Sequence, residues 1–211
     1  MAHAQPAPTT DANRARRDLD EHGIAVVAGA LARIEVRGIR ARLFDAIEVS
    51  EADDVPTRGY PFDPDEHNIR VFHLFNLDPV FVDLIQRPDA LEYVSYMLDD
   101  DFLISNFSAN ITEPGNGRMM LHADQGYVLP PWPDQPLACN VAWLLDDLND
   151  DNGGTRYVPG SHQLGHGPDE RETHETVGVS APAGSMLLLD GRLWHQTGEN
   201  TTTDRTRAAL F

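Results

Sequence analysis

A histidine and an aspartate stand two residues apart in the segment LHADQG, as His122 and Asp124. The residues before them favour a strand, and in a strand residues i and i+2 project from the same face. An imidazole and a carboxylate would then leave the backbone side by side. This arrangement is typical of half a metal site, but it also fits a surface ion pair, and short motifs of this kind often occur without a ligand.

A third ligand is expected in MLLLDGRLWHQTGEN, where His195 follows an apolar strand and a turn. Two histidines and one carboxylate form the facial triad that binds Fe(II) and leaves adjacent positions open. Oxygen chemistry needs those positions, because dioxygen and a co-substrate must share one metal. The alternative is a half-buried structural histidine packed beside Trp194, and His162 in VPGSH is expected to hold a loop.

An arginine lies downstream, because Arg207 stands twelve residues after His195 in the strand candidate TRAALF, with Arg205 two residues before it. A guanidinium on a core strand is costly unless it meets a carboxylate, which it binds in a bidentate fork. A dicarboxylate that chelates the metal with its other end would supply that partner.

The chain resembles the phytanoyl-CoA dioxygenase family of Fe(II)/2-oxoglutarate oxygenases, which share a double-stranded β-helix, or jelly roll. The resemblance covers about Ser105 to Phe211, and the first hundred residues match only loosely. The segments that carry it follow the family's order: ITEPGN, LHADQ, ACNVAWLLDD, DDNGGTRYVPGSHQ, APAGSMLLLDGRLWHQTGEN and RTRAALF.

The resemblance implies that Fe(II) is the cofactor, with 2-oxoglutarate and O2 as co-substrates. The implied metal ligands, which are also the catalytic residues, are His122, Asp124 and His195. Arg207 is implied to hold the far carboxylate of 2-oxoglutarate. Arg205 is its rival, because the spacing to Arg207 is one residue longer than in several family members. The remaining implied co-substrate contacts are Thr197, Trp143 and Thr155.

The elements that must position these residues fall into two halves. Apolar spacing predicts a helix over 31–47, with further helices over 14–21 and 79–98, where Pro88 either interrupts the helix or opens a second one. GIAVVAG predicts a short strand, and the Pro-, Asp- and Gly-rich residues 50–68 predict a surface loop. After Asp99, short β-prone runs separated by turn residues predict an antiparallel sandwich or barrel.

We therefore expect one domain over 1–211 that is mainly β with flanking helices. It would consist of a mobile tail over 1–13, a helical part over 14–98 and a jelly-roll core over 99–211. Family members usually continue beyond the position of Phe211, so we expect either a truncated chain or a different arrangement of that sheet edge.

Composition limits the partners. The net charge of −18 opposes binding to nucleic acid and to anionic membranes. No apolar run approaches the roughly 20 residues that span a bilayer. The one cysteine, Cys139, forms no internal disulfide framework and favours a reducing, cytoplasmic setting. The sequence does not predict the oligomeric state.

The predicted activity is hydroxylation of an unactivated C–H bond in a small, largely apolar molecule of secondary or lipid metabolism. A coenzyme A thioester is not expected, because Arg118 is the only basic residue between Ile111 and Pro136. The segments 58–76 and 127–136 are either lids over the pocket or ordinary surface loops with aromatic anchors.

Three other readings are less favoured. A zinc enzyme would leave Arg207 unexplained, and a halogenase of the same architecture would lack the carboxylate of Asp124. A non-catalytic jelly-roll binding module would have no use for an intact triad.

Overall fold

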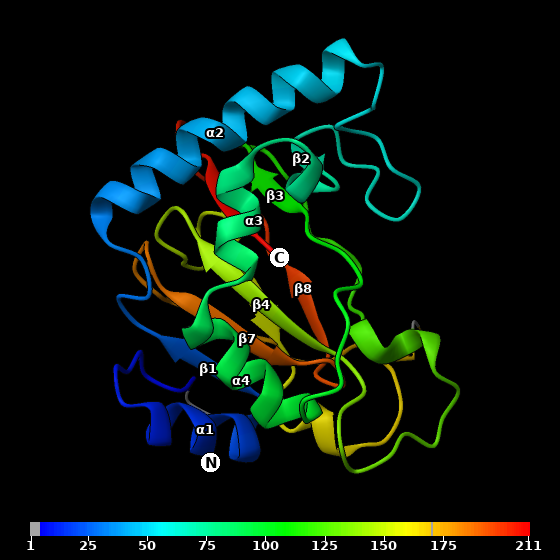
Figure 1. The fold of residues 1–211 in the computed structure, drawn as a ribbon. Coiled ribbons are helices and arrows are strands. Elements are labelled where there is room, and N and C mark those ends of the chain that lie inside the picture. Colours follow the sequence, from blue (N-terminus) through cyan, green and yellow to red (C-terminus); the bar gives the residue numbers. More distant parts are fainter. Residues whose placement is uncertain (1–4, 170) are drawn as a thin grey trace.

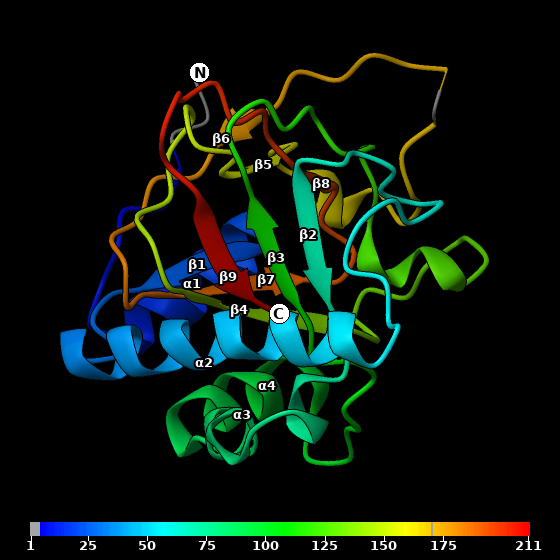
Figure 2. The same cartoon turned by 90° about the horizontal axis from the view of Figure 1, so that it is seen from above.

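Two antiparallel sheets face each other in the computed structural model, which describes residues 5–169 and 171–211 (Figures 1 and 2). The larger sheet has the strand order β1-β7-β4-β9-β3-β2, and the smaller has the order β6-β5-β8. The strands of the larger sheet are β1 (Ile24–Val27), β2 (Asn68–Val71), β3 (Ala109–Thr112), β4 (Cys139–Leu144), β7 (Met186–Asp190) and β9 (Arg207–Leu210). Those of the smaller sheet are β5 (Thr155–Tyr157), β6 (Val177–Gly178) and β8 (His195–Thr197).

Helices cover the outer face of the larger sheet (Figure 2). They are α1 (Ala12–His22), α2 (Arg33–Ala52), α3 (Pro79–Ile85) and α4 (Pro88–Leu98), and short 3-10 turns are η1 (Leu74–Asn76), η2 (Asp124–Tyr127) and η3 (Ser161–Gln163). Pro79 and Pro88 each occupy the first turn of a helix, where the missing N–H costs nothing. Pro88 therefore opens a second helix, which decides between the two alternatives.

Strand alternation gives the larger sheet two different faces. On β4, Trp143 belongs to the apolar cluster under the helices, whereas Ala142 and Leu144 belong to the cluster between the two sheets. On β9, Ala208 lies under the helices and Ala209 lies between the sheets. Alternate residues of a strand share a face, so Arg207, the first residue of β9, points like Ala209 into the interior between the sheets.

The jelly-roll core and the three expected helical regions are confirmed. Two expectations need correction. The segment 58–76, expected to be a loop, contributes edge strand β2, because Asn68 to Val71 pair with β3. The expected tail over 1–13 is docked in part, since the Thr9 N–H donates to Val26 and the Thr9 carbonyl accepts from Ala28. Residues 1–4 lie outside the described residues.

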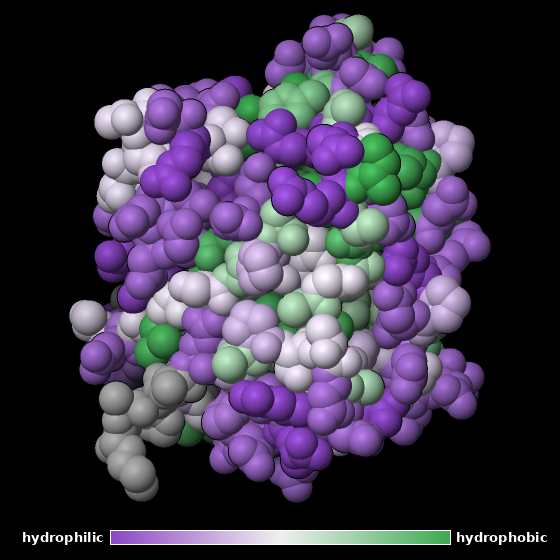
Figure 3. All heavy atoms as spheres, turned by 90° about the vertical axis from the view of Figure 1, so that its left-hand side faces the viewer, coloured by the Kyte–Doolittle hydropathy of each residue, from purple (hydrophilic) through white to green (hydrophobic). Residues whose placement is uncertain are grey.

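Among the described residues, no helix is both long enough and apolar enough to cross a bilayer. Hydrophilic side chains predominate on the face seen in Figure 3, which is the left-hand side of Figure 1. This agrees with a chain that carries 34 acidic and 16 basic residues.

Candidate metal centre

His122, Asp124 and His195 meet at one point, with their ligand atoms all within 4.8 Å of one another. His195 opens β8, and His122 pairs with it through two backbone hydrogen bonds of 3.0 and 2.8 Å. Asp124 begins η2, so the expected strand spacing of His122 and Asp124 is replaced by a turn. That turn brings Asp124 Oδ1 to 3.8 Å from His122 Nε2 and 3.9 Å from His195 Nε2.

Both imidazoles present the nitrogen that a metal needs. His122 Nδ1 lies 3.0 Å from the Met120 carbonyl, and His195 Nδ1 lies 3.0 Å from the Leu193 carbonyl. A carbonyl only accepts, so each Nδ1 carries the proton and each Nε2 keeps its lone pair for the centre. Burial and, to a smaller extent, the nearby His195 lower the pKa of His122 to about 4. His122 is therefore neutral at pH 7, which is the state that binds metal.

Asn140 fixes the orientation of the third ligand. It lies on β4 with the interior parity of Ala142, and its Nδ2 donates to Asp124 Oδ2 at 3.2 Å. The other carboxylate oxygen, Oδ1, is thereby left facing the two histidines. The sequence prediction missed this residue, although a polar side chain at an inward position of an apolar strand was a usable signal.

Arg207 is buried in the interior with a relative exposure of 1%. Its guanidinium donates to the carbonyls of Asn110 and Gly153, while its Nε has no partner. Burial and, to a smaller extent, the positive charge of Arg70 lower the pKa of Arg207 to about 9. Within the described residues, its hydrogen-bond acceptors are neutral carbonyls, so this buried cation suits the carboxylate of a ligand.

The other predicted co-substrate contacts lie in different parts of the structure. Thr197 and Thr155 lie opposite each other on β8 and β5. Arg205 is exposed and precedes β9, so it does not share the interior with Arg207. The Trp143 ring lies on the helix-covered face, where Arg87 sits 5.7 Å from its centroid, and its expected contact with the co-substrate stays a prediction.

The donor set fits the implied groups. Two imidazoles and one carboxylate are the ligands that Fe(II) oxygenases use, and they leave coordination positions for a co-substrate. The unpaired Nε of Arg207 supplies a donor for the far end of a dicarboxylate. Residues outside the triad contribute no second cluster of this kind in the part of the chain that is described.

Comparison with known proteins agrees with this geometry. Dioxygenase af480 of Aspergillus fumigatus is 40% identical over 206 residues, which cover 96% of this chain and 66% of that protein. The chain thus spans about two thirds of the length of this relative. The crystal structure of HygX from Streptomyces hygroscopicus, with nickel and 2-oxoglutarate bound, has a TM-score of 0.73 at 20% identity. That match covers 95% of this chain and 85% of HygX.

A second solved structure has the same fold. The non-heme alpha ketoglutarate dependent carbocyclase SnoK from nogalamycin biosynthesis matches with a TM-score of 0.74 at 22% identity, covering 97% of this chain and 85% of SnoK. The family match, described as phytanoyl-CoA dioxygenase (PhyH), runs from residue 19 to residue 209 and includes the triad and Arg207. This chain therefore belongs to the phytanoyl-CoA dioxygenase (PhyH) family.

Proposed function

We propose that this protein hydroxylates an unactivated C–H bond of a small, largely apolar molecule. The convergence of two free Nε2 atoms on one carboxylate oxygen carries the proposal, since it supplies a metal with three protein ligands. When bound, Fe(II) and 2-oxoglutarate supply an oxidant from O2 while 2-oxoglutarate is converted to succinate and CO2. Family membership supports this chemistry.

The chain's own residues would divide the remaining work. His122, Asp124 and His195 hold the metal, and Asn140 keeps the carboxylate turned toward it. Arg207 binds the far carboxylate of 2-oxoglutarate, since a buried guanidinium is stabilised by a bidentate partner. Thr197 and Thr155 are proposed as further polar contacts on the neighbouring strands.

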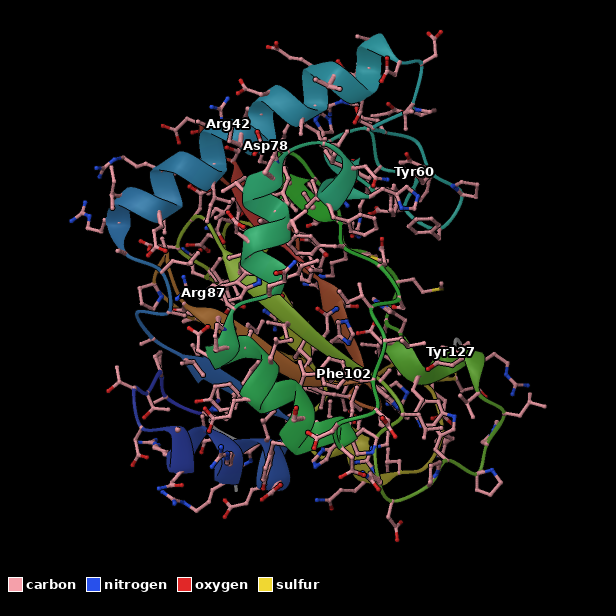
Figure 4. All side chains as sticks on the ribbon, viewed as in Figure 1. Arg42, Tyr60, Asp78, Arg87, Phe102 and Tyr127 are labelled. Atoms are coloured by element: carbon pink, nitrogen blue, oxygen red, sulfur yellow. The ribbon has the colours of Figure 1, made fainter. Side chains whose placement is uncertain are left out.

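The substrate proposal depends on the loops that surround the first ligands. Tyr127 is 72% exposed and Leu129 is 89% exposed, on the segment that follows Asp124. Leu103 is 94% exposed on the segment that precedes β3. In the view of Figure 4, Tyr127 at the end of η2 and Tyr60 on the loop before β2 both lie toward the right-hand side of the molecule. Apolar side chains with few fixed charges favour an apolar substrate over a coenzyme A thioester.

The loop over 127–136 is fastened at its base. Trp132 donates from Nε1 to Val128 at 2.7 Å, and Arg192 donates to the carbonyls of Pro133 and Asp134. Arg192 is itself held by Asp190 at 2.7 Å. We therefore propose that this segment is a fixed wall of the pocket, with Tyr127 and Leu129 as its exposed edge. With one cysteine, a reducing, cytoplasmic setting remains part of the proposal.

Metal titration of Asp124→Ala tests the metal centre. Loss of one ligand should weaken Fe(II) binding and abolish 2-oxoglutarate consumption while the circular dichroism spectrum stays that of the wild type. Glu172→Ala, an acidic position outside the triad, is the matched control and should bind metal normally. Full iron-dependent turnover by Asp124→Ala would show that the triad is assigned wrongly.

Substrate class is decided by a competition assay. Iron-loaded protein is incubated with 2-oxoglutarate, and succinate release is measured with free apolar acids, terpenoids or acyl-CoA thioesters. We expect stimulation by the free apolar compounds. Stimulation by the thioesters alone would refute the substrate proposal and leave the oxygenase proposal intact.

A further inference from the structure

A second guanidinium, that of Arg70, faces the same interior as Arg207. Arg70 lies on β2, where its two strand neighbours belong to the core under the helices, so its own side chain projects to the inner face. After burial, the charge of Arg70 is the next cause that lowers the pKa of Arg207. Arg70 also adds to the effects of burial and His195 on the pKa of His122. The strand register agrees, because Arg70 pairs with Asn110 on one side of β3 and Arg207 pairs with Thr112 on the other side.

One carboxylate, that of Asp63, connects these groups. Asp63 has 4% of its side chain exposed, and its Oδ2 accepts from Arg70 Nε at 2.7 Å and from Asn68 Nδ2. Asn68 Oδ1 in turn accepts from Asn110 Nδ2 at 2.7 Å. The Asn110 carbonyl accepts from Arg207 Nη1 at 3.4 Å. A polar chain thus runs from Asp63 to the partly buried guanidinium of Arg70 and to the buried guanidinium of Arg207.

Asp63 is also an inward anchor of a largely exposed loop, residues 53–67, which joins α2 to β2 and in which Thr57 is the other buried residue. Its N–H closes a turn onto the Tyr60 carbonyl at 2.9 Å. Tyr60 stacks 5.7 Å from Phe62 and lies 5.0 Å from Phe72, and Phe62 is half exposed. Tyr60 is visible on the outer part of this loop in Figure 4. The loop therefore carries an aromatic cluster outside and one buried carboxylate inside.

We propose that Asp63 is a positioning residue that couples loop 53–67 to the binding of 2-oxoglutarate. It acts through Arg70 on one side and through Asn68 and Asn110 on the other. The guanidinium of Arg70, with 13% of its side chain exposed, should move toward solvent when it loses its carboxylate partner, because an unpaired and largely desolvated charge is costly. This inference rests on the proposed function, since it assumes that a dicarboxylate occupies the interior beside Arg207.

The coupling must be reciprocal. If 2-oxoglutarate binds more tightly when the loop is fastened, then its binding must fasten the loop by the same free energy. Removing the Asp63 carboxylate should weaken co-substrate binding, and co-substrate binding should then no longer order the loop. A merely structural role would loosen the loop without this connection.

The test uses the full chain loaded with Mn(II), which binds 2-oxoglutarate without turnover. Calorimetry gives the affinity for 2-oxoglutarate, and hydrogen exchange read by mass spectrometry gives the protection of residues 53–67. In the wild type, 2-oxoglutarate should slow exchange in this loop. In Asp63→Ala, the affinity for 2-oxoglutarate should fall at least tenfold, and saturating 2-oxoglutarate should no longer slow hydrogen exchange in the loop.

Asp65→Ala is the matched control. Asp65 accepts from the backbone N–H groups of Gly117 and His67 at 2.7 and 2.8 Å, and it holds the same loop through backbone groups alone. This variant should exchange faster throughout the loop, remain sensitive to 2-oxoglutarate and bind it within threefold of the wild type. Should Asp63→Ala fail to fold, Asp63→Asn keeps an oxygen acceptor without the charge and should still lose affinity.

Several results would overturn the proposal. The first is hydrogen exchange in the wild-type loop that 2-oxoglutarate does not slow. The second is wild-type affinity for 2-oxoglutarate in both Asp63 variants, and the third is an equal loss of that affinity in the Asp63 and Asp65 variants. A wild-type protein that binds metal but no 2-oxoglutarate would instead refute the proposed function itself.

Discussion

Replacing Arg207 with methionine should separate co-substrate binding from stability. Truncating one partner of a buried charged pair typically costs about 2–5 kcal/mol of binding. At about 1.4 kcal/mol per tenfold, the affinity for 2-oxoglutarate should fall by roughly 30-fold to several thousandfold. In the ligand-free protein the balance differs, because the guanidinium has no anionic partner among the described residues.

Two terms oppose each other in the ligand-free variant. Methionine removes a buried unpaired cation, whose cost is several kcal/mol. It also leaves the carbonyls of Asn110 and Gly153 without this donor, at about 1–3 kcal/mol each. The free energy of unfolding should therefore stay within about 2 kcal/mol of the wild type. At 100 times the wild-type Kd, 2-oxoglutarate should stabilise the metal-loaded wild type by about 2.7 kcal/mol and Arg207→Met by less than about 1 kcal/mol.

Thermal unfolding with and without metal and 2-oxoglutarate measures both effects. Arg205→Met is the matched control, because Arg205 is exposed and lies outside β9. It should respond to 2-oxoglutarate as the wild type does. Equal loss of response in the two variants, or binding by Arg207→Met within threefold of the wild type, would refute the reasoning.

Two further predictions concern the metal centre. Asn140→Ala should weaken metal binding by about 10- to 100-fold, because it removes the donor that orients Asp124; a metal titration against Val141→Ala checks this. In the metal-free protein, the unfolded state takes up a proton at His122 near pH 6.5, whereas the folded state does so only near pH 4. Stability should therefore rise as the pH increases from about 4 to 6.5, and His122→Asn should flatten this rise in urea titrations. A variant that keeps the full slope would show that other groups cause it.

Most of the helices and strands could be predicted from the sequence, because its local signals agree with the fold. The helix starts follow from proline and capping chemistry, and the strands after Asp99 follow from short β-prone runs between turn residues. The triad was found because its residue types are chemically demanding and its scaffold segments are specific. The exposed position of Arg205 could not be read from the sequence, since it depends on where β9 begins.

The misses share one physical cause, which is the direction of side chains from strands whose register is set by distant partners. Trp143 and Asn140 lie on the same strand and point to opposite faces of the sheet. Only the pairing of β4 with β7 and β9 shows which of them faces His122, Asp124 and His195. Likewise, Asn68 to Val71 look like part of a polar loop until β3 supplies their partner. Periodicity indicates that two faces exist, but tertiary packing decides which face is inside.

The central position of β9 has a consequence for the newly made chain. β9 lies between β4 and β3, although its residues 207–210 come last among the strands in sequence. The half-sheet β1-β7-β4 and the pair β3-β2 cannot join until the ribosome has released these residues, so each half exposes an open edge during synthesis. Such edges are sites of aggregation, and pairings across this many residues form slowly. We expect the yield of native protein to depend on chaperones that shield those edges until β9 enters.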